Sequence, residues 1–74
     1  MVDFKTVKEG QCFLYEKSIF VVCEYNDYQG CYPVVCIATK NHEKYQVGDV
    51  LGFFDDTKIK IVPLEKIEKF IPND

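Results

Sequence analysis

The longest segment with strand character lies at residues 19–25, Ile-Phe-Val-Val-Cys-Glu-Tyr. β-Branched and aromatic residues dominate it and polar residues bound it on both sides, which predicts a β-strand. Successive side chains of a strand point to opposite faces. One face holds Ile19, Val21, Cys23 and Tyr25, and the other holds Phe20, Val22 and Glu24. Because both are largely apolar, we expect a strand that is central in its sheet, lies under a second layer, or contacts another protomer.

The preceding segment, residues 11–16, predicts a second strand that forms a hairpin with the first. With residues 17–18 as a two-residue loop, Leu14 would face Val21. This pairing sorts the side chains into two faces. The face that we expect to be the core holds Cys12, Leu14, Ile19, Val21 and Cys23. The other face is an aromatic patch that something must cover, and it holds Phe13, Tyr15, Phe20 and Val22.

The rest of the chain predicts three more strands, at residues 31–39, 50–54 and 58–62. Pro33 cannot donate a hydrogen bond to a neighbouring strand, so regular pairing should begin after it. Asn-Asp-Tyr-Gln-Gly at residues 26–30 is typical of a turn. In the last strand Ile59 and Ile61 alternate with lysines, which indicates an edge strand with its isoleucines inward and a charged outer face.

The C-terminal segment predicts one short amphipathic helix. Pro63 suits the first turn of a helix, and Pro72 would end it. The apolar residues between them have helical spacing: Leu64, Ile67, Phe70 and Ile71. This helix is the best candidate within the chain to cover the aromatic patch of the hairpin. If it lies elsewhere, contact between protomers is the better explanation for that patch.

The spacing of these elements predicts the fold class. Short strands with turns at intervals of roughly 8–12 residues, and no helix crossing between them, are typical of small antiparallel barrels and rolled sheets. A chain of 74 residues has room for one domain. We therefore predict a mainly β fold, in which residues 1–74 form a five-stranded antiparallel barrel with a short C-terminal helix. Closure would remove the open edges of so small a sheet.

Composition and charge narrow the function. The net charge is −3, and all nine basic residues are lysine. Arginine is the usual bidentate ligand of phosphate and guanine, so its absence argues against nucleic-acid binding. No apolar run approaches the ~20 residues of a membrane span, and the first residues do not resemble a signal peptide, so we expect a cytoplasmic protein. Its cysteines should then be reduced and serve as small buried hydrophobic residues: Cys12, Cys23, Cys31 and Cys36.

Several core and turn positions follow a common order along most of the chain: Phe4-x-x-Val7-x-x-Gly10-x-x-Phe13, an apolar strand, Val47-Gly48-Asp49 and Phe54-Asp55-Asp56-Thr57-x-Ile59. This order resembles that of small SH3-like barrel proteins that are common in bacteriophage genomes. The resemblance implies an SH3-like barrel and an accessory protein that acts in the cytoplasm of the host. It implies no catalytic residues.

The sequence offers few groups for catalysis. Its one histidine, His42, lies in the polar run at residues 40–44, which predicts a solvated loop. Cys31, Cys36 and His42 lack the spacing of a zinc site, because the strand between them turns alternate residues to opposite faces. The adjacent acids at residues 55–56 are typical turn formers. We therefore expect no catalytic residue, metal or cofactor, with a Cys31 thiol nucleophile near His42 as the alternative.

The eleven aromatic residues exceed what so small a core can hide. Tyrosine supplies a large amphipathic contact at low entropic cost, so tyrosines in or beside loops are candidate anchors for a partner. The candidate partner-binding residues are Tyr15, Phe20, Tyr25, Tyr28, Tyr32, Tyr45, Lys40 and Lys44. The alternative is that these rings simply cap the open ends of a barrel.

These observations lead to a functional hypothesis. We expect a non-catalytic binding module that binds and modulates a host protein, such as a defence or nucleic-acid-processing factor, and that forms a homo-oligomer. A second hypothesis is an oligomer that sequesters a small nucleotide signal between protomers. Aromatic rings interleaved with Lys40, Lys44 and Lys58 would then stack on bases, as small barrels do with single-stranded nucleic acid.

Overall fold

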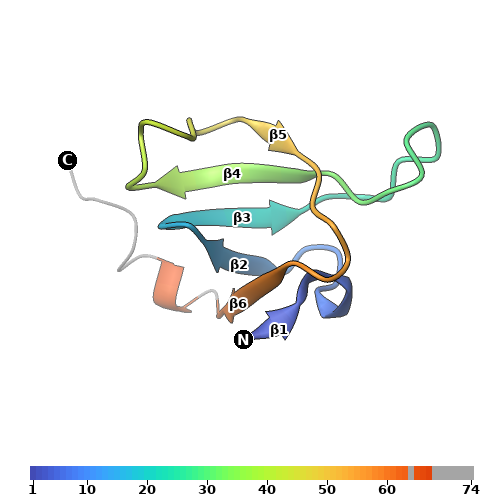
Figure 1. Ribbon diagram of the computed structural model, residues 1–74, viewed down its shortest axis with the longest axis horizontal. Helices are drawn as coiled ribbons and strands as arrows, with labels where there is room; N and C mark the ends of the chain where they lie inside the picture. Colours follow the sequence, from blue (N-terminus) through green and yellow to red (C-terminus); the bar gives the residue numbers. More distant parts are fainter. Residues whose placement is uncertain (64, 68–74) are drawn as a thin grey trace.

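The computed structural model describes residues 1–63 and 65–67. This part of the chain is mainly β, as predicted, with six strands in one antiparallel sheet and a 3-10 turn, η1 (Figure 1). The elements are β1 (Val2–Asp3), η1 (Phe4–Thr6), β2 (Cys12–Tyr15), β3 (Ser18–Val22), β4 (Val34–Thr39), β5 (Val50–Leu51) and β6 (Lys58–Val62). Their order across the sheet is β1-β6-β2-β3-β4-β5.

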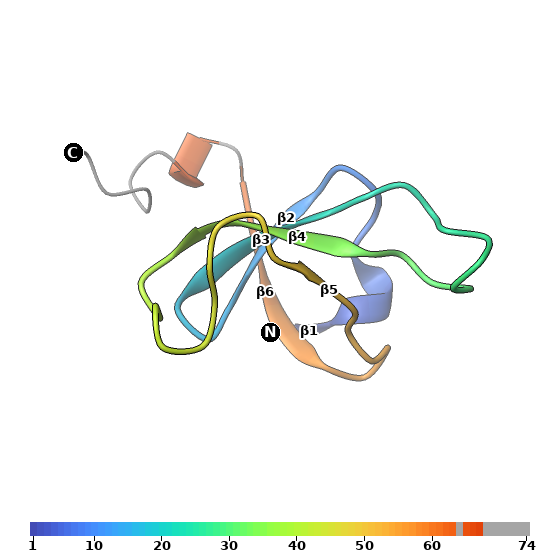
Figure 2. The ribbon, with the colours of Figure 1, turned by 90° about the horizontal axis from the view of Figure 1, so that it is seen from above.

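The sheet is open, whereas we predicted a closed five-stranded barrel. Its edges are β1 and β5, and no ladder joins these two strands within the described residues. β1 is the additional strand, and no residue pattern predicts it because it has only two residues. Figure 2 shows β1, β5 and β6 on the same side of the layer formed by β2, β3 and β4. The sheet therefore curls around a core without closing on itself.

β6 has the predicted bounds but not the predicted position. It lies between β1 and β2, so it is an inner strand and not an edge. Ile59 is fully buried, as expected, but Ile61 is 38% exposed. The difference between the two isoleucines follows from the length of β1, which pairs only with Lys58 and Ile59 and leaves the end of β6 without a neighbour on that side.

β2 and β3 form the predicted hairpin with a different turn. The two loop residues are Glu16 and Lys17, and both have a left-handed backbone, with φ of 48° and 63°. Two positive φ angles match the twist of the strands that such a loop connects. Ser18, predicted to be in the loop, belongs to β3 instead. Its buried hydroxyl shares a 2.7 Å hydrogen bond with the Thr39 hydroxyl on β4, which holds it in the sheet.

The register of this hairpin differs from the prediction by two residues, so Leu14 faces Ile19 and not Val21. A shift of two keeps every side chain on its predicted face, because the side-chain period of a strand is two. The main core, however, lies on the face that we expected to be a patch needing a cover. Its buried residues are Phe4, Phe13, Phe20, Val22, Val34, Cys36, Tyr45 and Ile59.

Distant segments of the same chain cover this aromatic face. The Phe4 ring lies 5.6 Å from that of Phe13, measured between centroids. The Phe53 ring lies 5.2 Å from that of Phe13 and 5.3 Å from that of Phe20. Edge-to-face and offset contacts at these distances are favourable. The patch is therefore buried within one chain, and neither a second protomer nor the C-terminal helix is needed to cover it.

The opposite face carries a smaller cluster of buried residues: Cys12, Ile19, Ala38 and Ile67. Residues 65–67 are helical, and Ile67 packs on this face. The described part of the predicted C-terminal helix, residues 65–67, therefore lies on the other side of the sheet from the aromatic patch. The remaining apolar residues of that prediction, Leu64, Phe70 and Ile71, lie outside the described residues.

Candidate functional site

The structure divides the predicted binding residues among several places. Tyr25, Tyr28 and Tyr32 belong to residues 23–33, which connect β3 to β4 and are called here the hairpin tip. A second region, called here the aromatic groove, is lined by Tyr15, Glu16, Lys44, Tyr45, Leu51, Gly52, Phe53, Phe54 and Thr57. Phe20 is a correction to the prediction, because it is fully buried and its ring cannot reach a partner, and Tyr45 lines the groove but is only 6% exposed and belongs to the core. Lys40 is exposed, in a shallow depression beside His42.

Asn26 organises the backbone of the hairpin tip. Its amide N–H donates to the Cys31 carbonyl at 2.9 Å, and its carbonyl accepts from the Gly30 N–H at 2.8 Å. Its side-chain Oδ1 accepts from the N–H groups of Tyr28, at 2.9 Å, and Gln29, at 3.1 Å. Asparagine favours turns because its side chain can replace a backbone acceptor in this way. Gly30 supplies a positive φ of 67°.

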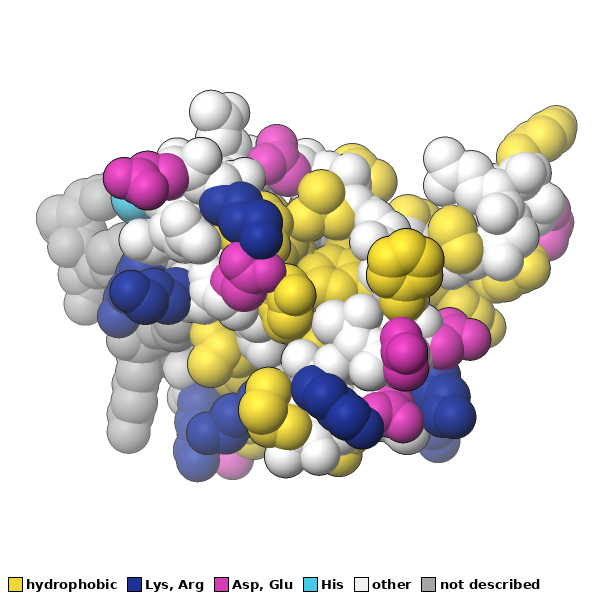
Figure 3. Space-filling view, in the orientation of Figure 1, with side chains coloured by type: hydrophobic (Ala, Val, Ile, Leu, Met, Phe, Trp, Pro, Cys, Tyr) yellow, Lys and Arg dark blue, Asp and Glu magenta, His cyan; other side chains and the backbone are white. Residues whose placement is uncertain are grey.

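The rings of the hairpin tip project into solvent. Tyr28 is fully exposed, and Tyr25 and Tyr32 are 46% and 44% exposed. The last two pack edge to face, with centroids 5.0 Å apart. Figure 1 shows the tip extending beyond the sheet, and Figure 3 shows hydrophobic side chains at its far end. Its charged residues, Glu24 and Asp27, are both acidic and exposed, and residues 18–39 contain no lysine.

The aromatic groove is a surface hollow of about 290 Å³ between the β2–β3 turn and the segment after β5. The Tyr15 ring meets that of Phe53 edge to face at 5.1 Å, and the ring of Tyr45 meets that of Phe20 at 5.3 Å. The groove walls are therefore continuous with the core. Phe54, at the rim, is 82% exposed. In Figure 3 hydrophobic side chains gather in the middle of this face, with charged side chains around them.

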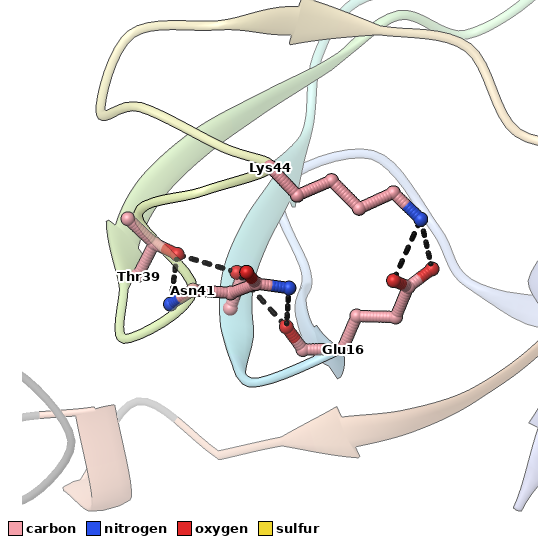
Figure 4. Close-up of polar contacts among 5 residues, drawn as sticks. Glu16, Thr39, Asn41 and Lys44 are labelled. Carbon is pink, nitrogen blue, oxygen red and sulfur yellow. Dashed lines mark hydrogen bonds and ion pairs between the residues drawn. The ribbon is translucent and has the colours of Figure 1, made fainter.

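An ion pair lies across the aromatic groove (Figure 4). The Lys44 Nζ donates to both carboxylate oxygens of Glu16, at 2.9 and 2.7 Å, and lies 5.6 Å from the centroid of the Tyr45 ring. Hydrogen bonding from Lys44, and then from Tyr15 and Tyr45, holds the pKa of Glu16 below its ordinary value. The same carboxylate raises the pKa of Lys44. Both groups are therefore charged at neutral pH.

Polar contacts fix the turn that carries Glu16 (Figure 4). The Lys40 N–H donates to the Lys17 carbonyl at 2.9 Å, and the Asn41 side chain donates to the Glu16 carbonyl at 3.5 Å. The Asn41 N–H donates to the Thr39 hydroxyl at 2.9 Å. Contacts between the β2–β3 turn and the loop after β4 therefore hold this side of the groove in place.

The groups considered for catalysis are not brought together. Cys31 precedes β4 and His42 follows it, so the length of a six-residue strand separates them. Cys12 and Cys36 are buried, and burial raises the pKa of both thiols. Within residues 1–63 and 65–67 no three His, Cys, Asp or Glu side chains are grouped so that they could hold a metal ion. In the same part of the chain no helix has the length and apolar character needed to cross a membrane.

Sequence reasoning named three residues of the aromatic groove and missed the other six: Glu16, Leu51, Gly52, Phe53, Phe54 and Thr57. Glu16 is 28 positions from Lys44, and the left-handed turn that aims its carboxylate at that lysine has no signature in the residue types. A partial signal existed for the two phenylalanines, because Gly52 before them breaks the strand pattern. Comparisons of the chain with protein-family models, with curated proteins and with solved structures found no match.

Proposed function

We propose that this protein is a non-catalytic binding module that docks on another protein through the hairpin tip. The observation that carries the proposal is the presentation of Tyr25, Tyr28 and Tyr32 on a turn that extends beyond the sheet. Tyrosine is enriched among the residues that dominate binding energy, because it buries a large ring and can also make a hydrogen bond. Three such rings at one end of a small domain are suited to entering pockets on a partner.

The local structure of the tip supports this role. Binding costs free energy when flexible groups must be ordered, and a rigid turn reduces that cost. Here the Asn26 side chain closes the turn, and Tyr25 and Tyr32 hold each other in place. The rings are therefore displayed in a defined arrangement before any partner arrives.

Charge indicates the kind of surface that would receive the tip. Glu24 and Asp27 are exposed beside the tyrosines, and residues 18–39 contain no lysine. Electrostatic complementarity favours a partner with apolar pockets and a basic rim. The order of core and turn residues that resembles phage SH3-like barrels, together with a sheet that curls around an aromatic core, supports an SH3-like phage accessory protein with a host protein as its partner in the host cytoplasm.

The test is affinity capture from a bacterial host lysate, followed by binding measurements with the protein retained. Tyr28→Ala should weaken binding roughly thirtyfold, the effect of losing one dominant interface residue. Asn26→Ala should weaken it less, because the rings remain but the turn is loosened. Val47→Ala is the matched control, since it trims an exposed apolar side chain outside both the tip and the aromatic groove, and it should bind like the wild type. Undiminished binding after replacing all three tip tyrosines with alanine would refute the proposal.

The alternative hypothesis, an oligomer that sequesters a nucleotide signal, would place its ligand in the aromatic groove. The ammonium of Lys44 is the cation there, and it already forms an ion pair with Glu16, which is unfavourable for an anionic ligand. Thermal unfolding with a panel of nucleotides separates the two hypotheses, because a ligand at 100 times its Kd adds ~2.7 kcal/mol to stability.

A further inference from the structure

The two charges in the aromatic groove differ in how firmly they are held. Glu16 belongs to the β2–β3 turn, has a left-handed backbone, and its main-chain carbonyl accepts from the Asn41 side chain at 3.5 Å. Its side chain is 33% exposed, whereas that of Lys44 is 55% exposed. Lys44 reaches the carboxylate with a long flexible stem from the loop after β4. The fixed charge of the groove is therefore negative, and the movable one is positive.

The rings of the groove favour a positive charge too. The face of an aromatic ring carries partial negative charge and attracts a cation within about 6 Å of its centroid. The Nζ of Lys44 lies 5.6 Å from the Tyr45 centroid, at the edge of that range. The Glu16 carboxylate and the Tyr45 ring thus act on the same ammonium group. Together they define a position for a cation that Lys44 fills from within the chain.

The apolar lining fits the stem of a lysine side chain. Leu51, Phe53 and Phe54 line the same hollow as Glu16, and Phe54 is largely exposed at the rim. A lysine buries its methylene chain along apolar surface while its ammonium group reaches a polar site. The aromatic groove offers both an apolar surface and a polar site, because the Glu16 carboxylate lies beside apolar and aromatic walls. A bare metal ion would need several oxygen or nitrogen ligands at one point, which the described residues do not group together.

We propose that the aromatic groove is a binding site for a lysine side chain of a protein partner, and that Lys44 is an internal occupant which such a lysine displaces. The incoming ammonium would take over the carboxylate of Glu16, and its stem would lie against Phe53 and Phe54. Lys44 would then swing into solvent, where its charge is readily hydrated. This site is separate from the hairpin tip and does not depend on the function proposed for the tip.

The experiment uses a defined probe, Nα-acetyl-lysine N-methylamide, titrated into the full chain and followed by NMR chemical shifts. Lys44→Met removes the internal competitor and should tighten probe binding roughly fivefold relative to the wild type, the scale of an exposed ion pair. Adding Glu16→Gln to that variant should then weaken binding roughly tenfold, because the ammonium loses its charged acceptor. Lys8→Met is the matched control, since it makes the same change of charge elsewhere, and it should bind as the wild type does.

A second probe separates charge from hydrophobicity. The norleucine analogue keeps the aliphatic stem but lacks the ammonium, so it should bind Lys44→Met at least tenfold more weakly than the lysine probe. Equal binding of the two probes would overturn the proposal, as would a Lys44→Met variant no tighter than Lys8→Met, or an undiminished affinity after Glu16→Gln. The spectrum of each variant reports whether it is folded, and Lys44→Leu replaces Lys44→Met if the latter is not.

Discussion

The body of the molecule and its hairpin tip use aromatic rings in opposite ways. In the body, Phe4, Phe13 and Phe53 come from segments far apart in the sequence and pack into one core. At the tip, Tyr25 and Tyr32 are seven positions apart and pack on each other, while Tyr28 stands in solvent. Phe13 and Phe20 are also only seven positions apart, but Phe53 packs against both, and both are fully buried. Cover by a distant segment, more than the residue type, therefore decides whether a ring here belongs to the core or to the surface.

The largest effect that distinguishes the two regions is on stability. Phe20→Ala should lower the free energy of unfolding by about 3–5 kcal/mol, because it empties a site at the centre of the aromatic core. Tyr28→Ala should change it by less than about 0.5 kcal/mol, because the ring is fully exposed. Guanidinium unfolding followed by circular dichroism measures both. Phe20→Leu keeps part of the packing and serves if the alanine variant does not fold. A comparable loss from Tyr28→Ala would show that the ring at the tip contributes to the fold as the core rings do.

A smaller effect is expected for the buried hydroxyl pair of the body. Thr39→Val should cost about 1–3 kcal/mol, because it keeps the shape of the side chain but leaves the buried Ser18 hydroxyl without the partner it has at 2.7 Å. Ser18→Ala combined with Thr39→Val should cost less than the sum of the two single changes, because each single change already removes the hydrogen bond that the two hydroxyls share. Urea unfolding of the three variants gives the coupling. Strict additivity would mean that the pair does not act as a unit.

The smallest effect concerns pH and the exposed ion pairs that join distant segments of the body. Hydrogen bonding from Lys58 lowers the pKa of Asp3 from 3.8, and hydrogen bonding from Lys44 lowers that of Glu16 from 4.5. Both pKa values are lower in the folded state than in the unfolded state. The two ion pairs therefore contribute their full stabilisation at a pH above the unfolded-state pKa values, and this stabilisation is lost as the pH falls through the folded-state pKa values.

The melting temperature should therefore decline as the pH is lowered from 6 to about 2, and this decline should become shallower in Asp3→Asn and in Glu16→Gln. Differential scanning calorimetry across this range checks it. Because both carboxylates are exposed, the change should be modest and should shrink in high salt. If the melting temperature of the Glu16→Gln variant falls with pH as steeply as that of the wild type, the Glu16–Lys44 pair does not contribute to the decline.

Local signals in the sequence predicted several elements well. β6 has the expected bounds because lysines and isoleucines alternate over its length. β4 begins directly after Pro33, since proline cannot join the ladder. The pairing of β2 with β3 was predicted correctly. The division of their side chains between two faces was also correct, because alternation is a property of residues close in sequence. Such features depend on neighbouring positions only.

Features that depend on distant contacts were predicted less well. The hairpin loop is at Glu16 and Lys17 because Ser18 is drawn into the sheet by Thr39, 21 positions away. The core was assigned to the wrong face because its cover comes from η1 and from the segment after β5. Phe20 was therefore taken for a surface residue. Exposure of the tip tyrosines was predictable from their turn, whereas the Glu16–Lys44 pair was not, because it joins two loops that meet only in the folded chain.

The two outermost strands, β1 and β5, have only two residues each. A strand from another molecule that approached either edge would meet only the two residues of β1 or β5, beside an end of β6 or β4 that these strands do not pair with, so neither edge offers one long continuous strand for growth into fibres. The short edge strands thus limit edge-to-edge pairing, which closure into a barrel would have prevented. This edge structure disfavours polymerisation through the sheet, although its strands carry many β-branched and aromatic residues.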